Sequence, residues 1–408
     1  MKNLFAERVL RNDTSDLNEI FKNSRNPENI SFAGGFPDKQ LFPTQALKAA
    51  YARAIDQAGP AIFQYASTQG LLSLRQKIAD RMATHAGVQA TAANVMLTQG
   101  GQQAIDLVAK LFLNRSDAMV VEGPTYMGAL AAFDTYEPTY YEVPVDKHGM
   151  DTDRLRTTLA AHPEIKLIYT VPDFHNPTGT TMSAKRRQTL VALANQYNVM
   201  ILEDSPYRDL RYSGKAVPAI KHYDTEGRVI FISSFSKILS PALRTGWIVA
   251  ATPVMDALVG LKSAIDVQSP NVTLAAIDQY LATNDIDAHI ATINQQYRVK
   301  RDAMLRALDR YFPSTVNYTR PAGGFFIWVT LPAGIDAQAL LRDVVLPQAH
   351  VAYVPASCQF ASRQVKNGFR LNYTSLSTAD ITSGVQRLGR ILQTQLAVAP
   401  QPKLSFQF

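Results

Sequence analysis

A lysine and an arginine lie seven residues apart near the middle of the chain. Lys237 closes the stretch Ser234-Phe-Ser-Lys, and Arg244 follows it. A lysine amine can form a Schiff base with a carbonyl group when its pKa is low enough for part of it to be neutral. An arginine can hold a phosphate through two parallel hydrogen bonds. The pair therefore suits a molecule that carries both an aldehyde and a phosphate.

Pyridoxal phosphate is the common cofactor with both groups, and its ring would need an acid and hydrogen-bond donors. Asp204 follows the apolar run 199–202, so we expect it at the carboxyl end of a strand, where it could keep a pyridine nitrogen protonated. An aspartate beside Ser-Pro is also a common turn residue. Asn176 and Tyr207 are candidate donors to the ring oxygen, although Asn-Pro is also a routine turn sequence.

A pair of glycines indicates a phosphate site. Gly100 and Gly101, followed by Gln102, lie between an expected strand and an expected helix, where backbone N–H groups at the start of the helix can face an anion. Glycine pairs also mark ordinary turns. Three other side chains could complete this site: Ser234, Ser236 and Arg244.

Two residues could contact the rest of a cofactor and its substrate. Tyr126 follows another expected strand, and its ring could stack on the cofactor or pack in the core. Arg370 lies between apolar residues late in the chain. A buried arginine needs an anionic partner, which is either a substrate carboxylate or a structural Asp or Glu.

Apolar runs and amphipathic segments alternate between about residue 95 and residue 250. One segment has apolar residues at helical spacing from Ala104 to Phe112, and another spans 183–197 with Ser183 as its expected N-cap. The alternation predicts a mostly parallel sheet with helices on both faces, and such sheets bind ligands at the carboxyl ends of their strands. The expected strands are 95–97, 118–121, 167–171, 199–202, 229–233 and 247–250.

The pattern changes near residue 285. A long charged helix is expected over 286–311, followed by Gly323-Gly324, a strand over 325–331 and a last helix over 378–396. This order predicts a second, smaller α+β domain.

Composition limits the class of protein. A chain of 408 residues is longer than one hydrophobic core usually supports, so we expect two domains. A composition of 46% hydrophobic and 18% charged residues is typical of a globular protein. A single cysteine, Cys358, and no signal-peptide pattern favour the cytoplasm, and no apolar run is long enough for a membrane span. The charge of +7 comes from scattered Lys and Arg residues, which suits anionic small molecules better than nucleic acid. We predict no metal site.

Taken together, these signals make the chain similar to the class I and II aminotransferases of pyridoxal phosphate (PLP) fold type I, from about residue 30 to residue 396. The resemblance implies an α/β fold with a mostly parallel, seven-stranded sheet between helices and a smaller α+β domain. We expect an N-terminal segment 1–40 associated with the small domain, a large PLP-binding domain 41–285 and a small domain 286–408. The chain most resembles the kynurenine and 2-aminoadipate (multi-substrate) group, through Ser31-Phe-Ala-Gly-Gly-Phe-Pro-Asp, Phe63-Gln-Tyr-Ala-Ser-Thr-Gln-Gly and Ser234-Phe-Ser-Lys.

The resemblance also implies a role for each candidate residue. Lys237 would hold the cofactor aldehyde as a Schiff base and serve as the catalytic base, and Asp204 would contact the pyridine nitrogen. Arg370 would hold the substrate α-carboxylate, with Gly35 nearby. Tyr65 matches a tyrosine that reaches the partner subunit's phosphate, which implies a homodimer with sites at the interface. The other contacts would come from Asn176 and Tyr207 at the ring oxygen (Asn176 also near the substrate), Tyr126 on the ring, and Gly101, Gln102, Ser234, Ser236 and Arg244 at the phosphate.

The implied reaction is transfer of an amino group from an aromatic, branched-chain or 2-aminoadipate-like L-amino acid to a 2-oxo acid such as 2-oxoglutarate, with ping-pong kinetics. A PLP-dependent lyase or decarboxylase on the same fold stays open, because the bond that breaks depends on substrate orientation. A non-enzymatic regulator is a further alternative, but such proteins carry a DNA-binding domain before this fold, and only about thirty residues precede the match here. Ser234-Phe-Ser-Lys also fits the S-x-x-K signature of serine acyl enzymes, and Arg244-Thr-Gly loosely resembles their K-T-G element. These two elements are almost adjacent here, which leaves no room for the S-D-N-like element expected between them.

Three residues depart from the family pattern. Gly101 stands where relatives often have serine, and Ala356 replaces a usual glycine. Asn18 lies where some relatives place an arginine that contacts the substrate side chain. The last departure leaves the side-chain specificity open.

Overall fold

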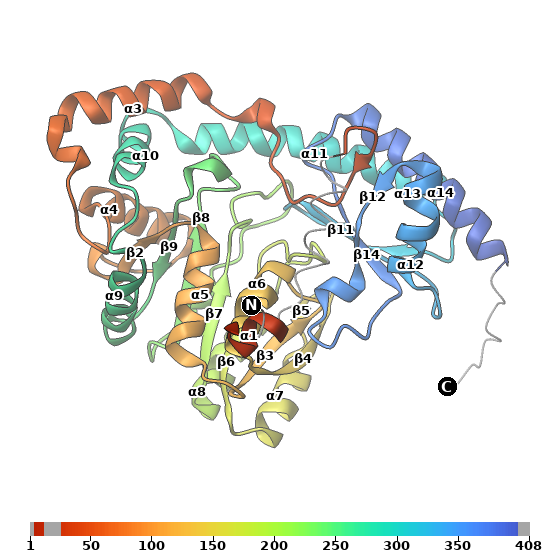
Figure 1. The fold of residues 1–408 in the computed structure, drawn as a ribbon, viewed down its shortest axis with the longest axis horizontal. Coiled ribbons are helices and arrows are strands. Elements are labelled where there is room, and N and C mark those ends of the chain that lie inside the picture. The colour runs from red at the N-terminus through yellow and green to blue at the C-terminus, as the bar shows by residue number, and fades with distance from the viewer. Residues whose placement is uncertain (1–3, 12–25, 399–408) are drawn as a thin grey trace.

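The computed structural model describes residues 4–11 and 26–398. Its largest feature is an eight-stranded sheet in the order β2-β9-β8-β7-β6-β3-β4-β5 (Figure 1). All six expected strands are present in it. The strands are β2 (Val95–Thr98), β3 (Ala118–Gly123), β4 (Thr139–Asp146), β5 (Gly149–Met150), β6 (Ile165–Thr170), β7 (Met200–Asp204), β8 (Val229–Ser234) and β9 (Gly246–Val249).

The sheet is mostly parallel, as predicted. β8, β7, β6, β3 and β4 pair in parallel, whereas β9 is antiparallel to both of its neighbours. The expected count of seven strands is wrong by one, because the two-residue β5 adds an antiparallel hairpin to β4. β4 was missing from the strands expected from the sequence, since only Val143 of its eight residues is buried and its apolar pattern is weak.

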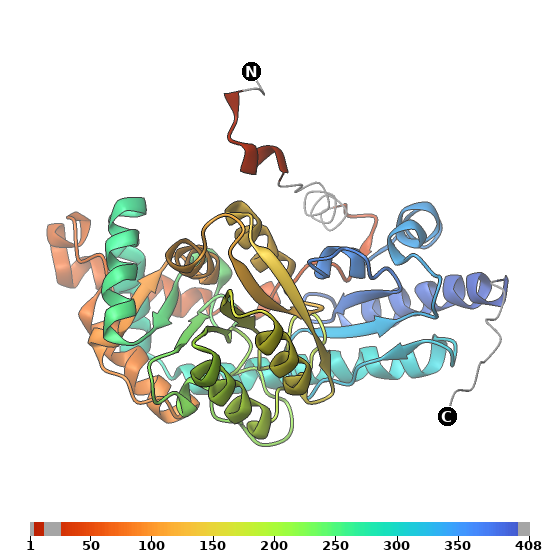
Figure 2. The ribbon, with the colours of Figure 1, turned by 90° about the horizontal axis from the view of Figure 1, so that it is seen from below.

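Helices cover both faces of this sheet (Figure 2). Successive strand residues point to opposite faces, so Val121 joins a core cluster with α5 (Gly101–Phe112) and α6 (Met127–Phe133). Val120 instead joins the cluster of α7 (Thr152–Ala161) and α8 (Ala184–Tyr197). Ser183 caps α8 as predicted, because its side chain accepts a bond from the Arg186 N–H.

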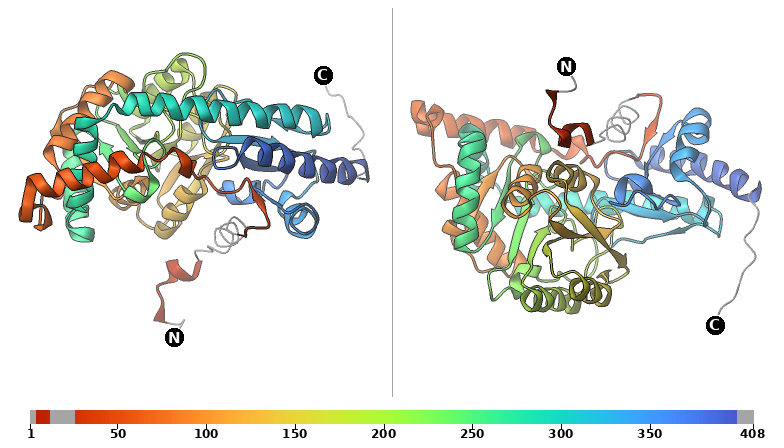
Figure 3. Two further views of the ribbon diagram at one scale, coloured as in Figure 1. Left: turned by 90° about the horizontal axis from the view of Figure 1, so that it is seen from above. Right: turned by 60° about the horizontal axis from the view of Figure 1, so that its bottom comes forward.

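The second sheet is antiparallel and has the order β10-β11-β14-β13. A long helix, α11, begins and ends where the sequence predicted and packs against the C-terminal helix α14 (Figure 3). Near its start, the Asn294 side chain also bonds to the Asp209 carbonyl beside the larger sheet. Because α11 contacts both parts, the expected domain boundary at 286 stays a prediction. The elements are β10 (Asn317–Tyr318), β11 (Phe326–Thr330), β13 (Val354–Pro355), β14 (Gly368–Asn372), α11 (Ile286–Tyr311) and α14 (Thr378–Val398).

The N-terminal segment runs beside the smaller sheet. β1 (Ile30–Ser31) pairs in parallel with β12 (Val351–Ala352), and the Phe32 carbonyl accepts a bond from the Asn372 N–H of β14. This pairing holds the residues that follow, 33–38, between the two sheets. No helix in the described ranges is both long enough and apolar enough to cross a membrane. The remaining helices are α1 (Glu7–Arg11), α3 (Thr44–Ala58), α4 (Leu72–Arg81), α9 (Thr252–Asp266), α10 (Asn271–Thr283), α12 (Ala337–Leu340) and α13 (Leu346–Ala349).

Candidate active site

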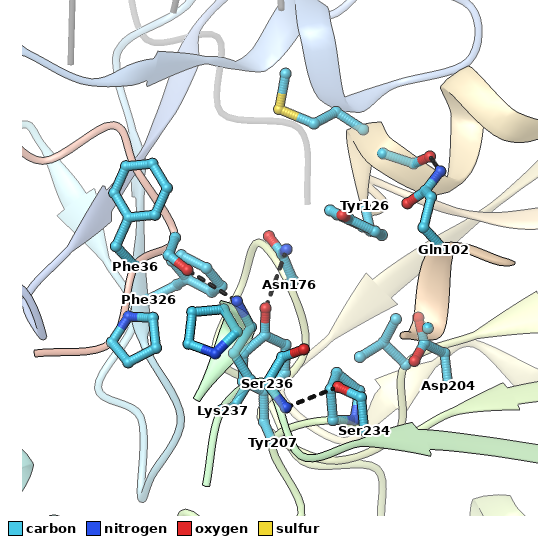
Figure 4. A pocket seen from close by; sticks show the side chains of 18 of the residues that line it. Phe36, Gln102, Tyr126, Asn176, Asp204, Tyr207, Ser234, Ser236, Lys237 and Phe326 are labelled. Carbon is cyan, nitrogen blue, oxygen red and sulfur yellow. Dashed lines mark hydrogen bonds between the residues drawn. The ribbon is translucent and has the colours of Figure 1, made fainter. Parts of the chain in front are cut away.

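A cavity of about 510 Å³ lies where strands β6, β7 and β8 end and β14 of the smaller sheet approaches. Figure 4 shows Lys237, Asp204, Asn176 and Tyr126 around this space. The sequence had placed these residues in separate loops, and parallel strands bring them to one edge of the sheet. Every candidate residue except Tyr65 lines the cavity: Gly35, Gly101, Gln102, Tyr126, Asn176, Asp204, Tyr207, Ser234, Ser236, Lys237, Arg244 and Arg370.

Lys237 lies in the loop that follows β8. Its Nζ donates a hydrogen bond to the Gly35 carbonyl at 2.9 Å and sits 5.5 Å from the centre of the Phe325 ring. Burial, together with the positive charges of Arg370 and Arg244, lowers the pKa of this amine to about 8, although the charge of Asp204 acts in the opposite direction. A substantial fraction of Lys237 is therefore neutral near pH 8, as a nucleophile or a base requires.

Asp204 is the last residue of β7, as predicted. Burial raises the pKa of its carboxyl group to about 7, although a hydrogen bond from Tyr169 and the charge of Lys237 act in the opposite direction. The Tyr169 hydroxyl donates to Oδ2 at 2.8 Å. Tyr169 was not among the residues predicted from the sequence, but a tyrosine next to the apolar Leu167 and Ile168 in an expected strand was a usable signal, because a buried tyrosine hydroxyl needs a partner.

Asn176 connects the two sheets. Its Nδ2 donates to the Tyr207 hydroxyl at 3.5 Å, and its Oδ1 accepts from Nη1 of Arg370 at 2.9 Å. The Tyr207 ring meets the Phe326 ring edge-on. The two candidate donors are thus neighbours, and a guanidinium from β14 is fixed beside them.

Arg370 lies in the middle of β14 and is buried. Besides Asn176, it bonds to the Ala33 carbonyl at 2.6 Å, and its guanidinium lies 4.2 Å from the centre of the Phe326 ring. Its Nε has no hydrogen-bond partner, and no carboxylate in the described part of the chain forms an ion pair with it. Burial lowers its pKa to about 10. Of the two partners left open by the sequence, a structural Asp or Glu is not found among the described residues.

The start of α5 forms the expected turn beside Arg244. Gly100, the N-cap, has φ of 80°, and a Cβ there would lie 2.6 Å from Nη2 of Arg244, so this position needs glycine. That Nη2 donates to the Gln99 carbonyl at 3.0 Å. A Cβ at Gly101 would meet no atom within 4 Å, so the serine expected from the family pattern would fit at this position.

Other candidate residues complete the walls. Tyr126 is the N-cap of α6, and burial raises the pKa of its hydroxyl. Gln102 turns its side chain to the Gly128 carbonyl, at 2.6 Å. Ala356 is buried in a short helix next to β13. Asn18 lies outside the described residues.

Tyr65 lies away from the cavity of its own chain, with 80% of its surface exposed. The predicted contact with the partner subunit's phosphate remains a prediction. Several apolar lining residues had no signal in the sequence, because nothing separates them from ordinary core residues: Phe36, Ile105, Met127, Ala131, Val171 and Phe326.

The residues present fit pyridoxal phosphate. An amine with a lowered pKa lies opposite a buried carboxylate, and an arginine adjoins backbone N–H groups at the start of α5. The unpaired Nε of Arg370 leaves one buried positive charge for a second anion. Such a site can hold an aldehyde, a protonated ring nitrogen, a phosphate and a carboxylate together.

Comparison with known proteins leads to the same class. A family model described as aminotransferase class I and II matches residues 30–388. The chain is 38% identical over 396 residues to aromatic-amino-acid aminotransferase 1 of Thermococcus litoralis, covering 96% of this chain and 94% of the relative. It is 35% identical over 397 residues to 2-aminoadipate transaminase of Thermus thermophilus, covering 97% and 98%.

A solved structure also matches nearly the whole chain. The crystal structure of Pyrococcus horikoshii kynurenine aminotransferase in complex with PMP has a TM-score of 0.93 at 36% identity, and the match covers 97% of this chain and 98% of that one. Fold, site and relatives agree, so this chain belongs to the class I and II aminotransferases and is a pyridoxal phosphate-dependent enzyme of fold type I.

Proposed function

We propose that the chain transfers the amino group of an aromatic, branched-chain or 2-aminoadipate-like L-amino acid to a 2-oxo acid such as 2-oxoglutarate, in two half-reactions at one site. The observation that carries this proposal is the buried guanidinium of Arg370, which faces the same cavity as Lys237 and has an unpaired Nε. A substrate α-carboxylate would supply the missing charge and the missing acceptor.

The candidate residues would divide the cofactor among them. Lys237 would hold its aldehyde, Asp204 its protonated ring nitrogen, and Asn176 with Tyr207 its ring oxygen. When bound, the cofactor supplies a ring that accepts the electron pair left at the substrate α-carbon. Tyr126 would stack on that ring, and the phosphate would lie against Gly101, Gln102, Ser234, Ser236 and Arg244.

Lys237 would move the proton. Its Nζ would take the proton from the substrate α-carbon, and a pKa of about 8 would leave enough neutral amine for this role. Arg370 would fix the carboxylate, with Gly35 and Asn176 beside it, and so decide which bond of the α-carbon faces Lys237. Burial of the site would keep water from competing for the proton.

The lining favours an uncharged donor side chain. The cations that line the cavity are Lys237, Arg244 and Arg370, and each has a role in the scheme above. The remaining wall is mostly apolar, with Phe36, Met127 and other hydrophobic residues. Aromatic and branched-chain donors would bury more apolar surface there than 2-aminoadipate, whose second carboxylate lacks a described cation.

We further propose a cytoplasmic homodimer in which Tyr65 completes the partner subunit's phosphate site. Tyr65 is 80% exposed, and Phe63 and Leu72 nearby in sequence are 68% and 62% exposed. Large exposed hydrophobic residues that gather in one segment are typical of a protein contact surface. A second copy of the chain would cover them. Sedimentation velocity at several concentrations tests the dimer, and a monomer at all of them contradicts it. Detection in the membrane fraction of lysed cells would contradict the location.

Replacing Lys237 with alanine tests the central assignment. We expect loss of turnover and of the visible absorption that a lysine-bound cofactor shows, while Lys166→Ala, at an exposed ion pair with Asp117, keeps both. Retained turnover in Lys237→Ala would refute the assignment. A donor screen with 2-oxoglutarate, read out as glutamate formation, then identifies the substrate. Carbon dioxide or ammonia released without glutamate would favour the decarboxylase or lyase alternative.

A further inference from the structure

Asp266, the last residue of α9, holds a group of amides next to the expected phosphate site. Its Oδ2 accepts hydrogen bonds from the side-chain amides of Gln99, at 2.8 Å, and Gln103, at 2.7 Å. Its Oδ1 accepts from Nζ of Lys262 at 2.5 Å, and the Lys262 side chain is fully buried. Asp266 does not itself line the cavity.

A carboxylate so close to a phosphate site needs an explanation, since like charges repel. Lys262 provides it, because its ammonium neutralises Asp266 from the side away from Gln99 and Gln103. The Lys262–Asp266 pair then has no net charge, while the Asp266 carboxylate remains a charged acceptor for the two amides. Hydrogen bonds to such a charged acceptor are about twice as strong as those between neutral groups.

These bonds fix the backbone that leads into α5. The Gln103 side chain accepts from the Gln99 N–H at 2.8 Å, and the Gln99 carbonyl accepts from Arg244 at 3.0 Å. Gln99 is therefore held at its N–H, its carbonyl and its side chain. It directly precedes Gly100, whose N–H donates to the Thr98 carbonyl at 2.8 Å, and Gly101, whose N–H at the start of α5 would face the phosphate.

The residue after Asp266 is in a strained conformation. Val267 has φ of 61° and ψ of −55°, which a β-branched residue rarely adopts. The Gln268 N–H bonds to the Asp266 carbonyl at 2.6 Å and closes a γ-turn of the rare, positive-φ type. Val267 is 50% exposed, so burial of its own side chain does not explain the turn.

Strain of this kind persists only where the surroundings fix the chain on both sides. On one side Asp266 is held as described. On the other, the Gln268 side chain accepts a hydrogen bond from the N–H of Ala66, which follows Tyr65, and the Ser269 hydroxyl bonds to the Leu97 carbonyl of β2 at 3.4 Å. The strained turn therefore joins the start of α5 to the loop that carries Tyr65.

We propose that Asp266 is a positioning residue for the phosphate-binding turn and that the γ-turn at Val267 couples this turn to the Tyr65 loop. The proposal rests on the proposed function, since it takes the start of α5 as the phosphate site. If Tyr65 serves the partner subunit, one strained turn sets the geometry of a phosphate contact in each of the two active sites.

Asp266→Asn tests the first half, because it puts an amide donor where one carboxylate oxygen accepted. We expect the dissociation constant of the cofactor, measured by equilibrium dialysis of the holoenzyme, to rise about ten-fold or more, the range for one hydrogen bond to a charged group. Phosphorus NMR of the bound cofactor should shift at the same time. Asp117→Asn is the matched control, since Asp117 also accepts from a lysine and an amide but lies far from the cavity. Should Asp266→Asn not fold, Gln103→Leu carries the same expectation.

Val267→Gly tests the coupling. Glycine adopts positive φ without strain, so thermal stability should be kept or rise while cofactor binding weakens. If Val267 had a purely structural role, thermal stability and cofactor affinity would change in the same direction. Unchanged cofactor affinity and an unchanged phosphorus signal in Asp266→Asn and Gln103→Leu would overturn the proposal. Failure of the wild type to bind PLP would instead show that the proposed function is wrong.

Discussion

Replacing Arg370 with alanine gives the sharpest test of how substrates bind. The change removes a buried guanidinium that bonds to Asn176 and to the Ala33 carbonyl and lies over the Phe326 ring. Both the amino acid and the 2-oxo acid carry an α-carboxylate, and both would occupy this site in turn. The two substrates should therefore lose the same interaction.

The size of the expected rise in KM follows from the hydrogen bonds that Arg370 can make. Each hydrogen bond to a charged group contributes roughly 1.5–3 kcal/mol, and the unpaired Nε indicates that Arg370 has at least one bond to offer a carboxylate. At about 1.4 kcal/mol per factor of ten, the KM for each substrate should rise about 10- to 150-fold. The variant should also lose stability, because Asn176 Oδ1 and the Ala33 carbonyl both lose a buried donor.

Steady-state kinetics with both substrates varied gives the two KM values, and thermal unfolding reports stability. Arg75→Ala is the control: Arg75 is also buried and donates to backbone carbonyls, of Gly70 and Ala92, but lies outside the cavity. We expect this variant to lose stability without a matching rise in either KM. A rise for only one substrate, or for neither, would refute the shared carboxylate site.

Two further predictions concern charge and assembly. Burial raises the pKa of Asp204 to about 7 in the folded protein from the ordinary 3.8. Between about pH 4 and pH 7 the folded cofactor-free enzyme therefore holds a proton that the unfolded chain has lost, and its free energy of unfolding should fall as the pH rises through this window. Asp204→Asn should flatten that slope in thermal unfolding, and a slope equal to that of the wild type would contradict the assignment. Tyr65→Phe should leave the dimer intact in sedimentation but raise the cofactor dissociation constant about ten-fold; equal binding by both proteins would remove Tyr65 from the phosphate site.

Local patterns in the sequence were enough for most of the architecture. Six strands of the large sheet, the cap of α8 and both ends of α11 follow from apolar periodicity and a capping residue, which depend on near neighbours in the chain. β4 was not predicted because only one of its eight residues is buried and its alternation is weak, and β5 because it has only two residues.

The chemistry of the site divides in the same way. The sequence by itself determined which groups are available: an amine at Lys237, a carboxylate at Asp204 beyond a strand, and an arginine at position 370. Only the tertiary structure decided that β14 brings Arg370 to Asn176, that Tyr169 bonds to Asp204, and that Asp266 reaches Gln99. These pairs are separated by 194, 35 and 167 residues, and no local rule relates positions so far apart. Burial, which lowers the pKa of Lys237 to about 8 and leaves Nε of Arg370 without a hydrogen-bond partner, exists only once both sheets have closed around the cavity.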